Sequence, residues 1–355
     1  MTTELDAAKA QAFGGQMMGV LNGAMLAIMG SIGHETGLFD TMATLPPSTS
    51  EEIARAAGLN ERYVREWLAV MVTGRIVEYE PGGLTYRLPP EHAASLTRAA
   101  GPGNLANMMQ FVSLIGQVEE DLVGSFRKGG GVPYSRYPKF QRLMAQQSAT
   151  IFDASLVDVT LKLVPGLTDR LRAGLDVADV GCGSGHAINL MARAFPNSRF
   201  TGIDFSEEGT AAGRAEAKAL GLTNATFELE DAATLTVPAR YDFITTFDSV
   251  HDQAHPDRML AGIAAALRPG GTYLCVDVAA SSNLEENLEH PIGPMMYAIS
   301  AAHCMTVSLA LGGMGLGAMW GQQKANQMLR EAGFSKVETA HVEGDFFNNY
   351  YVASR

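Results

Sequence analysis

The chain has 355 residues, of which 46% are hydrophobic and 18% charged, and this composition excludes intrinsic disorder. A formal net charge of -12 argues against attraction to nucleic acid or to an anionic membrane surface, which favours a small-molecule ligand. The length predicts two domains. Three widely separated cysteines and an N-terminus without the pattern of a leader peptide predict a cytoplasmic protein.

Two uncharged stretches, residues 17–33 and 291–323, have about the length of a membrane span. Glycines interrupt both of them, and Pro294 also interrupts the second. We therefore expect core helices in both stretches and no membrane partner.

The first half of the chain has the pattern of helices followed by a winged helix. Residues 17–45 predict apolar helices, and residues 50–57 and 61–73, separated by a glycine-containing turn, predict a helix-turn-helix. The alternating segments 76–80 and 84–88 flank a Pro-Gly-Gly turn and predict a β-hairpin. Together these elements form a winged helix.

Winged helices often bind DNA, so the charge of this one is a test of that function. Between residues 50 and 98, six arginines stand against seven glutamates, a net charge of -1, and no basic face is available for phosphate contacts. We expect a dimerisation or packing module and no nucleic-acid partner. Helices resume at 105–125, and a long helix at 138–164 is expected to close an N-terminal domain of residues 1–165.

From residue 176 onwards strands and helices alternate, which is typical of a parallel sheet covered by helices on both faces. We expect a doubly wound α/β domain over residues 166–355, with an insertion at about 284–321 and a closing antiparallel pair at 336–342 and 348–353. The other strands are expected at 176–181, 198–204, 225–230, 241–247 and 271–278, and the helices at 185–195, 207–220, 255–267 and 322–332.

A glycine-rich turn, with the sequence DVGCGSG, comes directly after the first of these strands. Gly181, Gly183 and Gly185 carry no Cβ atoms, so the backbone can pass close to a nucleoside. Asp179 is placed to meet a charged amino-acid tail. Asp204 follows at the end of the second strand, where a carboxylate can accept the hydroxyls of a ribose.

The third strand ends at Asp231 and Ala232, where an acid can accept from an adenine amino group and a small side chain leaves room for the base. Phe205 is placed to cover the other face of that base. The Gly-x-Gly-x-Gly spacing favours S-adenosylmethionine over a nicotinamide cofactor. Taken singly, Asp204 and Asp231 are also explained as helix N-caps, whereas their register on successive strand ends favours one shared ligand.

The fourth strand leads into the sequence FDSVHD, on the same edge of the sheet. Phe247 and Asp248 are expected to face the cofactor, and His251 is expected to lie close to the methyl group that is transferred. An imidazole that titrates near neutrality can take the proton of an attacking hydroxyl. Asp252 or Asp248 is expected to hold the imidazole tautomer or to touch the ligand. The alternative is a histidine that only hydrogen-bonds a loop.

The insertion at 284–321 is rich in methionine and is expected to lie beyond the strand ends, over the acceptor. Met295, Met296 and Trp320 are the expected substrate contacts, and their chemistry suits an apolar or aromatic acceptor. Core packing explains such a methionine pattern equally well. No group of side chains in the sequence requires a metal ion.

The sequences DVGCGSG, GIDFSEE, EDA, DSVHDQAHPDRML and LRPGGTYLCVD together resemble the class I S-adenosylmethionine-dependent methyltransferases, over about residues 176–355. The winged helix and the sequence GGGVPYSRYPKFQRLMAQQS extend the resemblance to the winged-helix-fused small-molecule O-methyltransferases, and in particular to a bacterial subgroup. Gln253, where that family has tryptophan, and the long insertion depart from the pattern. The resemblance implies a Rossmann-like seven-stranded domain, a homodimer formed by the N-terminal domain, His251 as the base, and a cofactor site at Gly181, Gly183, Asp204, Asp231 and Ala232.

The expected function is methyl transfer to the hydroxyl of a small, apolar or aromatic acceptor. N- or C-methyl transfer is the alternative within enzymes. An amine acceptor in particular needs no strong base. A regulator that senses S-adenosylmethionine and binds DNA is the alternative outside enzymes. The charges of the recognition helix cancel, and this weighs against DNA binding.

Overall fold

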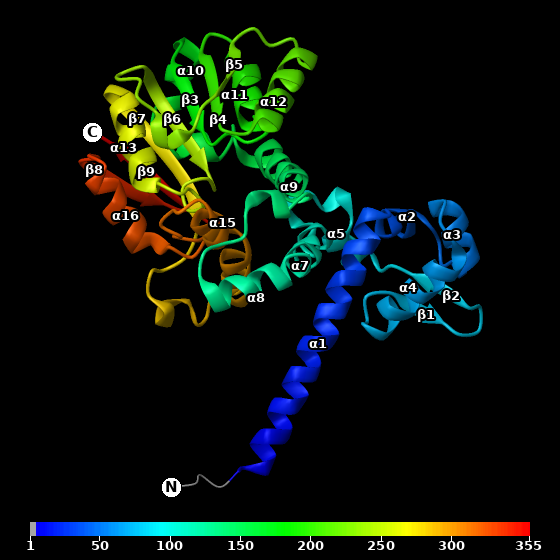
Figure 1. The fold of residues 1–355 in the computed structure, drawn as a ribbon. Coiled ribbons are helices and arrows are strands. Elements are labelled where there is room, and N and C mark those ends of the chain that lie inside the picture. Colours follow the sequence, from blue (N-terminus) through cyan, green and yellow to red (C-terminus); the bar gives the residue numbers. More distant parts are fainter. Residues whose placement is uncertain (1–4) are drawn as a thin grey trace. The chain divides into compact units, whose positions relative to one another are not determined.

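The computed structural model describes residues 5–355. The expectation about a leader peptide concerns the N-terminal segment, whose first four residues lie outside the described part. The chain divides into two compact units, Met1–Gly116 and Gln117–Arg355 (Figure 1). The expected domain boundary at residue 165 falls inside the second unit. Leu156 and Leu161 explain the difference, because both are fully buried in the core of the sheet domain.

The first unit contains the expected helix-turn-helix and wing. A capping box, in which Thr49 and Glu52 bond each other's backbone, begins α3, and Gly58 ends it in a left-handed conformation. The two strands of the wing pair antiparallel. The elements are α1 (Ala7–Glu35), α2 (Leu38–Thr44), α3 (Ser50–Ala57), α4 (Glu61–Thr73), β1 (Glu78–Glu80), β2 (Thr85–Arg87), α5 (Pro90–Leu96), η1 (Arg98–Gly103), α6 (Leu105–Met108) and α7 (Gln110–Gly116).

Helix α1 is longer and more exposed than the sequence predicts. The apolar stretch 17–33 was expected to form a core helix, but only the last turns of α1 are buried. There the indole nitrogen of Trp67 donates to the carbonyl oxygen of Met29 at 2.8 Å, and Phe39 meets the same indole edge-on. By length and composition, α1 is the one described helix that is apolar enough to cross a membrane, and its most apolar window is exposed.

The second unit is built on a seven-stranded sheet of order β5-β4-β3-β6-β7-β9-β8. The first five strands of the chain in this sheet run parallel, and β9 pairs antiparallel with both β7 and β8. This confirms the expected α/β fold and its closing antiparallel pair. The strands are β3 (Asp176–Val180), β4 (Arg199–Asp204), β5 (Ala225–Leu229), β6 (Tyr241–Phe247), β7 (Leu267–Val278), β8 (Lys336–Ala340) and β9 (Asn348–Ser354).

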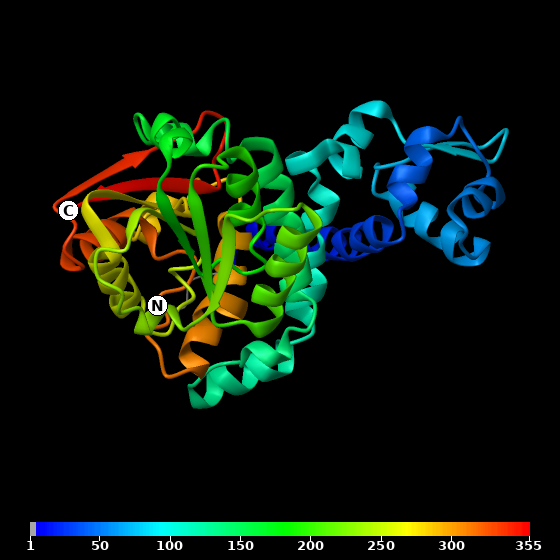
Figure 2. The same cartoon turned by 90° about the horizontal axis from the view of Figure 1, so that it is seen from above.

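Helices cover both faces of this sheet (Figure 2). Along β7 the side chains alternate between the two cores: Tyr273 and Cys275 pack with α13 and α16, whereas Leu274 and Val276 pack with α10 and α11. The sheet is therefore buried on both sides, as the nearly continuous apolar strands predict. The helices are α8 (Glu119–Lys128), α9 (Phe140–Ser155), α10 (Leu167–Ala173), α11 (His186–Ala194), α12 (Glu207–Ala219), α13 (Pro256–Ala266) and α16 (Gly321–Glu331), with the short turns η2 (Tyr134–Arg136), η3 (Thr160–Leu163), η4 (Ala232–Thr234) and η5 (Leu284–Asn287).

The single long helix expected at 138–164 is wrong. Helix α9 ends at Ser155, and a turn and the short helix η3 follow it. The reason lies in the spacing of Leu156 and Leu161: both point into the core, and two residues five apart do not share one face of an α-helix.

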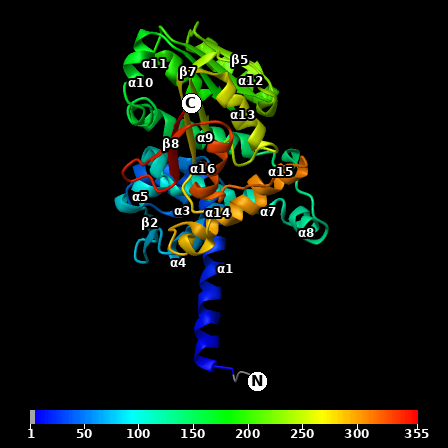
Figure 3. The same cartoon turned by 90° about the vertical axis from the view of Figure 1, so that its left-hand side faces the viewer.

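The insertion after β7 lies at the carboxyl ends of the parallel strands, as expected. It contains α14 (Gly293–Ile299), the π-helical turn η6 (Ser300–Cys304) and α15 (Met305–Ala310). Its backbone is fixed to the loop after β6: the amide of Gly317 donates to the carbonyl oxygen of His251 at 3.1 Å, and that of Met314 donates to Ala254 at 3.0 Å. Helix α15 lies beyond the ends of the strands (Figure 1), with α14 beside it (Figure 3).

Two glycines of α1 give a matched test of the packing in the first unit. A Cβ at Gly33 would lie 2.6 Å from the ring of Trp67, whereas a Cβ at Gly19 would meet no described atom within 4 Å. We expect Gly33→Ala to lower the free energy of unfolding by about 1–3 kcal/mol. Gly19→Ala should raise it by about 0.5–1 kcal/mol, because alanine favours the helix.

The measurement is denaturant unfolding followed by tryptophan fluorescence in a Trp320→Phe background, so that Trp67 is the reporter. Equal effects of the two alanines would contradict the packing described for α1.

Candidate active site

The carboxyl ends of β3, β4, β5 and β6 bring the predicted residues to one edge of the sheet. The glycine-rich turn follows β3, and the backbone amide of Gly183 donates to Oδ2 of Asp204 at 2.8 Å. The amide of Gly181 donates to the carbonyl oxygen of Ile203, at the end of β4. The turn and the second strand end are therefore one connected structure, as their spacing in the sequence predicts.

The three glycines of the turn differ in what surrounds them. A Cβ at Gly181 would lie 2.6 Å from Ser249, and a Cβ at Gly185 would lie 2.2 Å from the ring of Phe227. A Cβ at Gly183 would meet no atom of the described chain within 4 Å. Gly181 and Gly185 are thus required by packing, whereas Gly183 leaves backbone open to a ligand.

Asp204 is buried at the end of β4, and both of its carboxylate oxygens accept backbone hydrogen bonds. Oδ2 accepts from Gly183, and Oδ1 accepts from the amide of Ser206 at 2.8 Å. Burial raises the pKa of Asp204, and the backbone hydrogen bonds of Ser206, Gly183 and Phe205 oppose that rise. Each oxygen keeps a second lone pair, so the carboxylate can still accept ribose hydroxyls.

Asp179 is fully buried on β3, where Oδ1 accepts a hydrogen bond from the hydroxyl of Thr245 at 2.8 Å. Burial raises its pKa to about 7, with a further rise from the charge of Asp204 and an opposing effect of Thr245. A group of positive charge, such as the ammonium of an amino-acid tail, would restore the ionised form.

The end of β5 looks different from the other strand ends. Asp231 is exposed and caps the turn η4, because its Oδ1 accepts from the amide of Ala233 at 2.9 Å. The N-cap interpretation therefore accounts for Asp231 without a ligand, and Ala232 packs into the core. Phe205 is 56% exposed, and its ring meets Tyr134 edge-on, with 6.4 Å between centroids.

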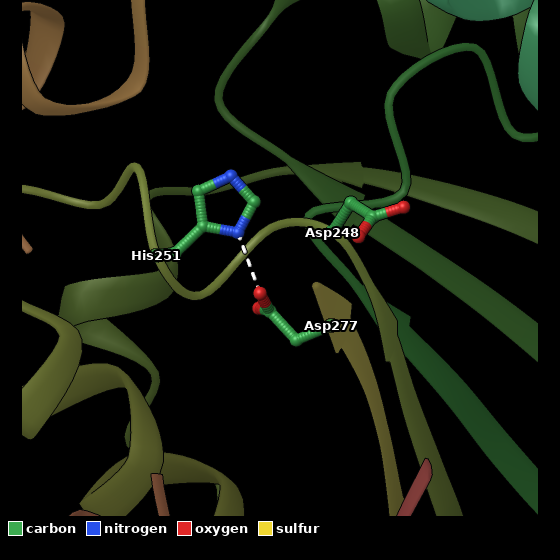
Figure 4. A group of neighbouring side chains, drawn as sticks. All are labelled: Asp248, His251 and Asp277. Atoms are coloured by element: carbon green, nitrogen blue, oxygen red, sulfur yellow. Dashed lines mark hydrogen bonds and ion pairs between the residues drawn. The ribbon is translucent and has the colours of Figure 1, made fainter. Parts of the chain in front are cut away.

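His251 forms a buried pair with Asp277, a residue that the sequence analysis missed (Figure 4). The ring nitrogen Nδ1 lies 2.7 Å from Oδ1 of Asp277, and the second ring nitrogen points away from the carboxylate. The same Oδ1 accepts from the indole of Trp320 at 3.0 Å and from the amide of Val278 at 2.8 Å. A signal was present: Asp277 is a lone acid near the end of the buried strand YLCVDV.

The expectation that Asp252 or Asp248 holds the imidazole is wrong. Asp252 accepts at 3.4 Å from its neighbour Gln253, and Oδ1 of Asp248 is buried with no partner in residues 5–355. The reason is the alternation of side chains in β7, which directs Asp277 towards the loop that carries His251.

Opposing effects set the protonation of this group. Burial lowers the pKa of His251, but the negative charge and hydrogen bond of Asp277, together with the neighbouring Cys304, outweigh it and raise the pKa well above its ordinary value. Burial raises the pKa of Asp248 to about 7 and that of Asp252 to about 6. The imidazole is paired with Asp277, whose Oδ1 is also held by Trp320 and by the amide of Val278.

The arrangement also bears on metal binding. Asp248, His251 and Asp277 offer three possible ligand atoms within 4.8 Å of one another, a cluster that the sequence did not suggest. Oδ1 of Asp277 accepts three N–H groups, which suits an acceptor that orients the imidazole, whereas Oδ2 has no hydrogen-bond partner in residues 5–355.

The predicted substrate contacts lie in different surroundings. Trp320 is 5% exposed and lies behind Asp277, to which it donates. Met296 packs with a small apolar cluster that includes Cys304 and Met319, and Met295 is half-buried on α14. Phe247 meets Phe152 of α9 edge-on.

Two protein families match the chain. Residues 24–98 match the Rv2258c-like winged HTH domain, and residues 171–333 match a methyltransferase domain. The nocamycin O-methyltransferase of Saccharothrix syringae is 32% identical over 207 residues, which cover 55% of this chain and 72% of that protein. The fatty-acid O-methyltransferase of Mycolicibacterium smegmatis is 32% identical over 114 residues, 32% of this chain and 40% of that protein, so the chain spans less than half of that relative.

Solved structures share the fold over nearly the whole chain. Human N-acetylserotonin methyltransferase in complex with S-adenosylmethionine has a TM-score of 0.69 at 17% identity and covers 99% of both chains. Mitomycin 7-O-methyltransferase has a TM-score of 0.70 at 17% identity, with 99% of this chain and 100% of that chain covered. An O-methyltransferase of neocarzinostatin biosynthesis, bound to S-adenosylmethionine and 2-hydroxy-5-methyl naphthoic acid, has a TM-score of 0.64 at 17% identity and covers 93% and 96%.

A doubly wound sheet with a glycine-rich turn, a buried acid on the next strand and a helical winged-helix unit defines a class of enzyme. The chain belongs to the S-adenosylmethionine-dependent methyltransferases that carry a winged helix-turn-helix domain. The expected fold, enzyme class and cofactor are thereby confirmed.

The two acids at successive strand ends give a matched test of the cofactor site. Asn in place of Asp204 has one oxygen for two backbone amides, so the turn at Gly183 loses a fixed partner. We expect Asp204→Asn to weaken the binding of S-adenosylhomocysteine by about tenfold or more, measured by calorimetry. Asp231→Asn keeps an N-cap and an acceptor, and should change affinity by less than about threefold.

If Asp231→Asn weakened the binding of S-adenosylhomocysteine more than Asp204→Asn, the exposed end of β5 would contribute more to cofactor affinity than the buried end of β4.

Proposed function

We propose that this enzyme transfers a methyl group from S-adenosylmethionine to the hydroxyl oxygen of a small, apolar or aromatic acceptor, with His251 as the general base. The observation that carries the proposal is the buried His251–Asp277 pair, placed at the same strand ends as the glycine-rich turn. The names of the relatives, including nocamycin O-methyltransferase and fatty-acid O-methyltransferase, support an oxygen acceptor.

The cofactor residues follow from the geometry of the strand ends. The open backbone at Gly183 and the lone pairs of Asp204 fit the ribose and the amino-acid part of the nucleoside, and Asp179 fits its ammonium. S-adenosylmethionine supplies an electrophilic methyl group on its sulfonium sulfur. We assign the adenine to the region of Phe205, Asp231 and Ala232, and the remaining wall to Gly181, Gly185, Phe247 and Asp248.

His251 takes the proton of the acceptor hydroxyl as the oxygen attacks the methyl group. Asp277 holds Nδ1 of the imidazole, which leaves the other nitrogen to receive that proton. The imidazolium that results is stabilised by the carboxylate, whose position is fixed by Trp320 and by the amide of Val278. Asp252 lies beside this pair and stabilises the positive charge from a greater distance.

The acceptor is expected to be uncharged. Asp248, Asp252 and Asp277 form an acidic group around His251, so a carboxylate on the acceptor near the reacting oxygen would be repelled. The insertion over the strand ends supplies Met295 and Met296 for apolar contact, and Trp320 acts by fixing Asp277. These features favour a neutral phenol or alcohol over an anionic substrate.

The alternatives make different demands on these residues. A neutral amine acceptor already carries a nucleophilic lone pair and does not require a base fixed by a buried carboxylate, so the His251–Asp277 pair favours oxygen over nitrogen. A DNA-binding regulator requires free cations on the recognition helix. On α4 the guanidinium of Arg62 pairs with Glu66 at 2.7 Å and that of Arg65 pairs with Glu61 at 3.2 Å, which argues against that function.

The pH dependence of turnover tests the role of His251. A base must be neutral to act, and the pKa of His251 is raised, so the protonated, inactive form persists to higher pH than for an ordinary histidine. We expect kcat/KM to rise with pH through this raised pKa and then to level off. The probe reaction is methylation of catechol, followed by release of S-adenosylhomocysteine.

Two variants separate the roles in the pair. His251→Ala should lower kcat on the order of a hundredfold or more and remove the pH limb, with cofactor binding retained. Asp277→Asn removes the charge that raises the pKa, so the limb should shift to lower pH while the plateau falls. Full turnover by His251→Ala would leave methyl transfer in place but end the proposal of a histidine base.

We also propose that the enzyme is a homodimer formed through the N-terminal unit. The part of α1 from Phe13 to Met25 carries large apolar side chains that stay exposed within one chain, a surface that a soluble protein normally covers. A second copy of the same unit supplies a matching apolar helix. The exposed side chains are Phe13, Met17, Met18, Val20, Leu21 and Met25.

A charge introduced on α1 tests the dimer. We expect Leu21→Glu to shift sedimentation from a dimer to a monomer, because a buried unpaired carboxylate opposes association. Leu84→Glu, at an exposed position in the wing, is the matched control and should leave the dimer intact. A wild-type protein that sediments as a monomer would contradict the proposal.

A further inference from the structure

The insertion holds a buried histidine that the mechanism above does not use. His303 lies in the π-helical turn η6 and is 2% exposed. Neither of its ring nitrogens has a hydrogen-bond partner within residues 5–355. Leaving a buried polar group unpaired is unfavourable, so such a residue is usually retained for a function. Single π-helical turns are also frequent at functional sites.

The surroundings of His303 are aromatic. The ring of Phe140 stacks on the imidazole with 3.5 Å between centroids and 16° between planes, and Tyr137 and Tyr134 meet it edge-on at 4.8 and 5.3 Å. Burial, with a smaller effect of His251, lowers the pKa of His303 to about 3. The imidazole is therefore neutral and offers one hydrogen-bond donor and one acceptor.

His303 is close to the reacting groups. The next residue, Cys304, contributes to the raised pKa of His251, and the charge of His251 acts on His303. On the other side, Tyr134 lies between His303 and Phe205, which follows Asp204 on the cofactor side. The second histidine thus lies between the general base and the aromatic edge of the cofactor region.

The segment that covers His303 is not held equally along its length. Tyr134 belongs to the short turn η2 and is only half-buried, whereas Val132 before it is buried and its amide donates to Oγ1 of Thr306 at 2.9 Å. Tyr137 is also buried, and its hydroxyl donates to the carbonyl oxygen of Ala302 at 2.5 Å. The ring of Tyr134 is therefore the least enclosed of the aromatic group, while Tyr137 holds the turn that carries His303.

We propose that His303 determines acceptor specificity by hydrogen-bonding a second oxygen of the acceptor while His251 serves the oxygen that is methylated. This inference rests on the proposed function. The class of acceptor that fits is an uncharged aromatic ring with two neighbouring oxygens, of which catechol is the smallest example. The ring enters on the side of Tyr134 and lies among the aromatic side chains, where flat rings stack favourably.

The first test compares acceptors that differ by one oxygen. Wild-type enzyme should prefer catechol to phenol in kcat/KM by about tenfold or more, because a site with an unpaired polar group discriminates against a ligand that lacks its partner. His303→Phe keeps the stack on Phe140 but removes both nitrogens, and the preference should fall to about threefold or less, mainly through KM for catechol. His303→Asn keeps a donor and an acceptor and should restore part of the preference. His92→Phe, the same change at an exposed histidine of the first unit, is the control and should keep the preference.

The second test does not depend on turnover. Imidazole resonances of ¹⁵N-histidine-labelled enzyme are recorded with S-adenosylhomocysteine, and the His303 signal is assigned by its loss in His303→Phe. Catechol should shift this signal and phenol should not, while the other histidines outside the site serve as internal controls. Thermal unfolding without acceptor adds a third measure: His303→Phe should raise Tm, because an unpaired polar group has been replaced by an apolar ring.

The outcomes separate this inference from the proposed function. A catechol-dependent shift of the His303 signal without methyl transfer supports the inference and contradicts the function. Methyl transfer to catechol with an unchanged preference in His303→Phe overturns the inference and leaves the function standing. A His303 signal that catechol does not move, or a Tm that falls in His303→Phe, also overturns it, since the imidazole is then a structural residue.

Discussion

One carboxylate oxygen organises the active site. Oδ1 of Asp277 accepts N–H groups from His251, from Trp320 and from the backbone of Val278. A carboxylate buried between two helical layers is stabilised by hydrogen bonds, and these three donors supply them to Oδ1, while Oδ2 has no partner among residues 5–355. The pair therefore depends on the strand, on the loop after β6 and on the start of α16 at once. Each of these elements is held in place by the same oxygen.

The architecture of the sheet domain could be predicted closely from the sequence. The strands of the sheet and the helices α11, α12, α13 and α16 begin and end within a few residues of their expected bounds, because apolar runs, glycine turns and caps agree with one another there. The helix expected at 138–164 failed for a reason that pattern alone does not reveal: Leu156 and Leu161 face the core from separate turns. The exposure of helix α1 was not predicted, because apolar residues normally indicate a core helix and most of those in α1 lie on the surface of the chain.

The site was predicted in part. Sequence spacing identified the glycine-rich turn, Asp204 and His251, since each follows a strand of the same parallel sheet. It did not identify Asp277 as the partner, because the choice among three neighbouring acids depends on which way a side chain leaves its strand. It also gave no weight to His303, whose importance comes from its lack of a partner in three dimensions.

The last strand has a consequence for how this enzyme comes into being. Strand β9 lies between β7 and β8, and Asn349 stands directly opposite Asp277 in the antiparallel ladder. The ribosome therefore delivers the strand neighbour of Asp277 only after the whole insertion has emerged. Until then β7 is an open edge carrying an ionisable side chain, so the glycine-rich turn emerges well before the edge of β7 beside Asp277 is paired.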